Sequence, residues 1–176
     1  MWTAVTAYAA FLFVQTSVGM ILGMNREVER RKSVNFALLS GLMLTAFAFL
    51  GTGIARLLLM INNSRYFAGL LFLGITAVLV IKTVNINKMA LIFATDDRNN
   101  FMLSCVTMGL DAMIASIGCT FAFQYSHIVL ISFLPLFLIV GVLGVTIGLK
   151  TRTLLPLRIL MAASCVALFC AFLTTL

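Results

Sequence analysis

Residues 127–149 read HIVLISFLPLFLIVGVLGVTIGL, a run with no acidic side chain, lysine or arginine. About 20 consecutive apolar residues are enough to cross the hydrocarbon core of a bilayer as an α-helix. The run therefore predicts a transmembrane helix, and Pro135 predicts a kink within it.

The rest of the chain has the same character. Of its 176 residues, 62% are apolar and only 10% are charged, and the mean hydropathy is +1.15. Soluble domains carry roughly a quarter charged residues, because they present a surface to water. The composition excludes an ordinary soluble protein and predicts one that has lipid as its solvent. No Pro-, Gly- or Ser-rich linker divides the chain, so we expect a single transmembrane domain over residues 1–176.

Five other runs are long enough, or nearly so, to span a bilayer. They are residues 3–24, 33–55, 66–81, 101–125 and 154–176. The second run extends through Arg56 toward residue 61, and the third is short unless Lys82 snorkels to the interface. Pro156 falls in the first turn of the last run, where its missing N–H costs little. The sequence thus predicts an all-α polytopic membrane protein with six transmembrane helices.

The basic residues that give the chain its net charge of +7 gather in three alternate connections. These hold Arg26, Arg30, Arg31 and Lys32, then Lys82, Lys88 and Arg98, then Lys150, Arg152 and Arg158. The opposite side has only Arg56 and Arg65. By the positive-inside rule, we expect a multi-pass protein of the cell membrane with both termini extracytoplasmic. The basic residues form no patch with interleaved aromatics, so nucleic acid is not an expected partner.

The two halves of the chain, residues 1–86 and 99–176, can be aligned with a shift of 95 residues, which sets Thr16 against Asp111. Residues 16–23 (TSVGMILG) then face residues 111–118 (DAMIASIG). Three helices in each half would give the halves opposite orientations in the membrane. We therefore expect a 3+3 inverted repeat, the plan of many secondary transporters, whose sites lie near the midplane between the halves.

The octet at residues 111–118 resembles the Asp-Ala-x-x-x-Ser-Ile-Gly signature of the MntP-type manganese efflux pumps, which belong to the LysE exporter superfamily. Residues 50–53 (LGTG) and 71–74 (LFLG) also resemble the family, in its order. The resemblance covers most of the chain in its layout. It implies export of Mn²⁺ by a six-helix inverted repeat with one Asp on the first helix and one on the fourth. Asp111 fills the fourth-helix position, whereas Thr16 departs from the pattern on the first, leaving a single carboxylate.

Asp111 is the only acidic residue within any predicted span. A charge at the centre of a transmembrane helix costs about 2.5–3.5 kcal/mol, so its side chain should face the bundle interior and have a partner. Helical spacing puts Ser104 and Thr107 on the same stripe, which suits a cation path or close helix packing. We expect Asp111 to bind the transported cation; the alternative is a carboxyl group that only holds the bundle together.

Gln15, Thr16 and Ser17 interrupt the apolar first run near its middle. Their oxygens can coordinate a hard cation. They can equally form hydrogen bonds between helices or back to their own backbone. Both interpretations stay open for these three residues.

The predicted function is export of a divalent cation such as manganese by a secondary transporter that alternates access around Asp111. No resident cofactor is expected, because Cys105, Cys119, Cys165 and Cys170 lie in apolar runs without a Cys-x-x-Cys pair. No enzyme is expected either, since no His–carboxylate cluster or Ser/Cys–His pairing occurs. The alternative is a transport-deficient relative that acts as a membrane subunit or scaffold. The expected partners are the lipid bilayer and the transported cation. A further copy of the chain or a subunit of a membrane complex is also a possible partner.

Overall fold

A computed structural model describes residues 1–24, 30–59, 65–87, 98–151 and 153–175, and every regular element in these ranges is a helix. The six helices are α1 (Trp2–Met24), α2 (Arg30–Leu59), α3 (Arg65–Val84), α5 (Arg98–Ala122), α6 (Ser126–Lys150) and α7 (Leu155–Leu173). All six are long and apolar enough to cross a membrane. The predicted all-α polytopic fold is therefore confirmed. Most residues of the connections used to predict the orientation, 25–29, 88–97 and 152, lie outside the described residues.

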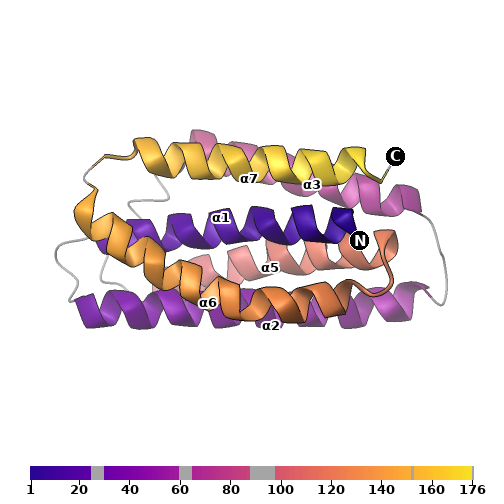
Figure 1. Cartoon of the computed structure of the whole chain (residues 1–176), viewed down its shortest axis with the longest axis horizontal. Helices are drawn as coiled ribbons and strands as arrows, with labels where there is room; N and C mark the ends of the chain where they lie inside the picture. Colours follow the sequence, from indigo (N-terminus) through magenta and orange to yellow (C-terminus); the bar gives the residue numbers. More distant parts are fainter. Residues whose placement is uncertain (25–29, 60–64, 88–97, 152, 176) are drawn as a thin grey trace.

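The clearest difference from the predicted helix boundaries is at the end of the fourth span. This span, residues 101–125, ends earlier as α5, and a short turn leads into α6 at Ser126. Phe123 and Tyr125 lie in this turn, and their apolar rings extended the predicted span past Ala122. Pro135 lies inside α6, which bends along its length, and Pro156 lies in the first turn of α7 as predicted (Figure 1).

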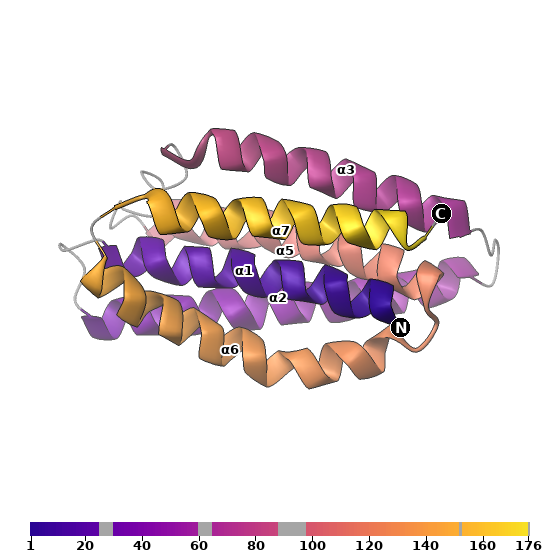
Figure 2. The same ribbon diagram turned by 45° about the horizontal axis from the view of Figure 1, so that its top comes forward.

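The helices form three layers of two: α3 with α7, α1 with α5, and α2 with α6 (Figures 1 and 2). Each layer takes one helix from each half of the chain. Moreover, α1 packs on α6 and α7 as α5 packs on α2 and α3. This is the pairing that an inverted repeat would give, and the repeat itself stays a prediction.

Both chain termini lie at one end of the bundle, which we name the terminal end (Figure 1). The opposite end, where α1, α3 and α6 finish, we name the basic end. Its described residues include the exposed basic side chains of Arg31, Lys32 and Lys150. At the terminal end, the Arg56 guanidinium donates a 2.6 Å hydrogen bond to Nδ1 of His127, which ties α2 to α6. Arg56 thus has a protein partner on a neighbouring helix.

The core is built around α1, which is buried on nearly all sides by the other helices. Tyr8, Phe11, Val14 and Val18 are among its fully covered side chains. A helix that is apolar all round is buried in this way, because it has no polar face to present to water. The outer helices instead expose large apolar side chains, including Leu42, Leu70, Ile131, Ile139 and Leu143, which suits a surface covered by lipid.

Glycines set the closest approach, between α1 and α6. A Cβ added at Gly144 would collide with the backbone oxygen of Thr16, and one added at Gly148 would collide with that of Met20. Gly19 on α1 faces Gly141 and Gly144 in the same way. Small residues let two transmembrane backbones pack closely where lipid offers no hydrophobic driving force for association. Gly19 is therefore part of a close helix–helix contact.

Candidate functional site

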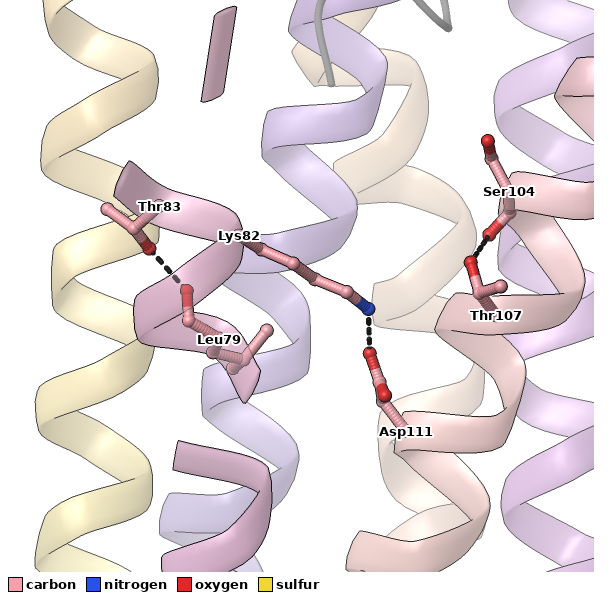
Figure 3. Close-up of polar contacts among 6 residues, drawn as sticks. All are labelled: Leu79, Lys82, Thr83, Ser104, Thr107 and Asp111. Carbon is pink, nitrogen blue, oxygen red and sulfur yellow. Dashed lines mark hydrogen bonds and ion pairs between the residues drawn. The ribbon is translucent and has the colours of Figure 1, made fainter. Parts of the chain in front are cut away.

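Asp111 lies midway along α5 and forms an ion pair with Lys82 of α3. The Lys82 ammonium donates to Oδ2 of the Asp111 carboxylate (Figure 3). The side chains are 15% exposed for Asp111 and 22% exposed for Lys82, so the pair is partly accessible rather than sealed in the core. It is the one ion pair among the side chains that the structure describes.

Lys82 is in the last turn of α3, near the basic end. The sequence predicted that its side chain would snorkel to the membrane interface. Instead, its aliphatic part crosses from α3 to α5 and brings the ammonium to the carboxylate (Figure 3). The physical reason is that two opposite charges at membrane depth cost less together than apart, because each compensates for the other's lost hydration. The expectation that Asp111 has a partner is met by a lysine of α3.

The two other residues of the predicted α5 stripe do not contact the carboxylate in the described structure. The Thr107 hydroxyl is exposed and donates a 2.8 Å hydrogen bond to the backbone oxygen of Ser104, one turn earlier (Figure 3). Ser104 itself is half-buried. Both residues lie on the basic-end side of Asp111. Neither of them adds a ligand for a cation bound at the carboxylate.

Gln15 is buried and links three helices. Its amide nitrogen donates to the backbone oxygen of Ala37 (2.9 Å) and to the Ser40 hydroxyl (3.0 Å), both on α2. The same nitrogen lies so close to Gly141 of α6 that a Cβ added there would be 2.7 Å from it. The Gln15 amide nitrogen thus bonds α1 to α2 and packs closely against α6.

Thr16 and Ser17 direct their hydroxyl groups back onto their own helix. Thr16 Oγ1 donates to the backbone oxygen of Leu12 (2.7 Å), and Ser17 Oγ donates to that of Phe13 (2.8 Å). The Thr16 backbone packs on α6 at Gly144. Ser17 faces the other side of α1, where it lies near the apolar side chains of Met108 and Met161.

These contacts divide the predicted site residues into separate groups. Asp111 is held by α3, whereas Gln15 and Thr16 are packed against α2 and α6 on another side of α1. No contact between Thr16 and Asp111 appears among the described residues. A divalent cation at Asp111 would find a single carboxylate that already has a lysine beside it. The described residues contain no group of three or more His, Cys, Asp or Glu side chains that could hold a metal ion.

Sequence reasoning did not identify Lys82 as part of the site, although a signal existed. Asp111 is the only acidic residue within a span, so its partner had to be a basic residue or a set of polar groups at membrane depth. Lys82 directly follows the third apolar run, where a long side chain can point either to the interface or into the bundle. That choice depends on how α3 is rotated relative to α5, which hydropathy does not specify.

The chain was compared with protein-family models, with curated proteins and with solved structures, and none of the three comparisons finds a match.

Proposed function

We propose that the chain is a secondary transporter of cations and that the Asp111–Lys82 pair is its exchange point. One observation carries the proposal: the side chains of Asp111 and Lys82 form an ion pair between two helices that are long and apolar enough to cross a membrane, and both stay partly exposed. Ionisable residues within transmembrane helices are costly and mark ion or proton pathways more often than structural contacts.

In the proposed cycle, the carboxylate binds two cations in turn. With Lys82 engaged, the pair has no net charge and the conformation is at rest. A transported cation displaces the ammonium, and the long side chain of Lys82, anchored in the last turn of α3, swings toward the basic end. Because the two cations compete for one carboxylate, the occupied and resting states differ in their α3–α5 contact. Because of that difference, cation binding favours one conformation over the other, as alternating access requires.

The cation to test first is Mn²⁺, which the resemblance to manganese exporters implies. The proposed direction is export across the plasma membrane, with the basic end cytoplasmic. A single carboxylate leaves a bound dication under-neutralised unless the substrate keeps part of its water shell or backbone carbonyls assist. Therefore Mg²⁺, Ca²⁺, Na⁺ and protons belong in the same assay.

The experiment uses purified protein in liposomes that contain a fluorescent indicator for each cation. We expect the wild-type protein to move at least one of these cations and Asp111→Asn to move none. Lys82→Gln should lower the concentration for half-maximal transport, because the competing ammonium is gone. Lys150→Gln, which removes an exposed cation at the basic end, is the matched control and should leave transport unchanged. Inactivity of the wild type with every cation would refute the proposal.

A second function is favoured by a different observation. Gln15, Thr16 and Ser17 all donate within the bundle or to their own backbone, and α1 and α6 are in tight contact at their glycines. Such a rigid interior suits a membrane subunit or scaffold of a larger complex. Under this proposal a partner co-purifies in fixed stoichiometry, which mass spectrometry of the complex detects, and Asp111→Asn changes the amount of complex without affecting cation levels.

A further inference from the structure

A second group of buried polar side chains lies toward the terminal end, where α1, α5 and α6 meet. It consists of Tyr8 from α1, Ser116, Cys119 and Thr120 from α5, and Ser126 from α6. The exposed fraction is 2% for Tyr8 and 0% for the other four. The Tyr8 phenol lies among the side chains of Ser116, Cys119 and Ser126. Nothing in the proposed transport cycle uses this group.

Two of these hydroxyl groups, those of Thr120 and Ser126, already form hydrogen bonds. Thr120 Oγ1 donates to the backbone oxygen of Ser116 (2.8 Å) and lies 2.7 Å from Ser126 Oγ. Because a threonine hydroxyl has one hydrogen, the Thr120–Ser126 bond must use the hydrogen of Ser126. Ser126 therefore has no hydrogen left to donate, but its oxygen can still accept.

Two further hydroxyl groups have no hydrogen-bond partner among the described residues: Tyr8 Oη and Ser116 Oγ. Each can donate one hydrogen bond and also accept. A buried polar group without a partner is costly, and most such groups in proteins are paired with protein or with ordered water. Buried water molecules in proteins typically supply the hydrogen bonds that such neighbouring polar groups lack.

We propose that this group of five residues binds one internal water molecule, independently of any transported cation. The water accepts from Tyr8 Oη and from Ser116 Oγ, and one of its own hydrogens goes to Ser126 Oγ. This pattern gives both unpartnered hydroxyls a partner and uses the free acceptor capacity of Ser126 Oγ. A cation fits less well, because the unpartnered groups need acceptors and the site lies at the positive N-terminal end of α6. An anion finds no basic side chain within the group.

The water is detected directly by X-ray radiolysis of the intact protein in detergent or liposomes, followed by mass spectrometry. Radicals formed from a bound water oxidise the side chains beside it, and brief mixing with isotopically heavy water separates slowly exchanging bound water from bulk solvent. We expect Tyr8 to be oxidised with slowly exchanging oxygen despite its burial. Phe11, equally buried on the same helix, is the matched control and should stay unmodified. Absence of oxidation at Tyr8 would overturn the proposal.

A stability measurement gives an independent answer. If the water binds, Tyr8→Phe removes a hydrogen bond and should lower the thermal midpoint by about 2–4 °C. Ser116→Ala should act in the same direction, and the double variant should lose less than the sum, because both residues hold the same water. Tyr125→Phe, at an exposed tyrosine, should change nothing. If the hydroxyls are unpaired in a dry core, Tyr8→Phe raises the midpoint instead, and the proposal fails.

Discussion

At the scale of single residues, the molecule pairs the few charges and amides that it carries within the membrane. Sequence reasoning identified Asp111 as the residue that needs a partner, because a lone charge in lipid is costly. It could not identify Lys82, since a lysine at the end of a span can reach lipid headgroups or the bundle interior equally well. It also left open whether Gln15 binds a cation or another helix. The bonds of Gln15 to Ala37 and Ser40 favour the second interpretation.

The ion pair predicts non-additive effects on stability. Asp111→Asn and Lys82→Gln each remove one partner and should lower the thermal midpoint, whereas the double variant should recover part of the loss. We expect a coupling free energy of about 0.5–3 kcal/mol from the double-mutant cycle. The value should fall below that of a sealed pair because both side chains are partly exposed. Combining Asp111→Asn with Lys150→Gln should give additive effects, and strictly additive effects for the Lys82 cycle would show that the pair has no energetic coupling.

The hydrogen bonds of Gln15 predict that its substitution lowers the stability of the protein without stopping cation transport. Gln15→Leu keeps the size of the side chain but removes both hydrogen bonds to α2, which should cost about 1 kcal/mol. Cation transport in liposomes should persist, because Gln15 is not part of the Asp111–Lys82 pair. Ser40→Ala, which removes one of the same bonds, is the control and should show a smaller loss. Abolished transport in a stably folded Gln15→Leu protein would place Gln15 in the cation path instead.

At the scale of helices, hydropathy predicted the number and the approximate extent of all six elements. It placed the end of α5 too late, because Phe123 and Tyr125 of the following turn were counted with the helix. It also gave no indication that α1, rather than any other helix, is the buried one. Burial of α1 depends on which faces pack together, and every face of every helix in this chain is largely apolar.

The α1–α6 contact predicts a strong position dependence of glycine substitutions. Gly144→Ala places a methyl group against the backbone of α1, which side-chain motion cannot relieve, and should destabilise by about 1–3 kcal/mol or more. Gly53→Ala on α2 is the matched control, because no atom lies within 4 Å of its added Cβ. There, alanine should stabilise the helix by about 0.5–1 kcal/mol. Thermal unfolding in detergent checks both, and equal effects at the two sites would contradict the close contact.

At the scale of the whole molecule, six passes place both termini on one side of the membrane and gather basic residues at the opposite end. Which end faces the cytoplasm is a prediction from charge alone. In a background without native cysteines, Tyr125→Cys should react with a membrane-impermeant maleimide on intact cells. Lys150→Cys should react only after the membrane is permeabilised. Both positions are exposed, so a reversed pattern, or equal labelling of both, would overturn the proposed orientation.

The central position of α1 has a consequence for how the chain is made. Its main neighbours, α6 and α7, follow it in the chain only after α2, α3 and α5, so α1 is covered late in synthesis. Gln15 can bind Ala37 and Ser40 as soon as α2 is made, but the glycine face of α1 stays open to lipid or to the insertion machinery until α6 arrives. We therefore expect a nascent chain that stops after α5 to leave this face uncovered and to be removed by membrane proteases faster than the longer chain.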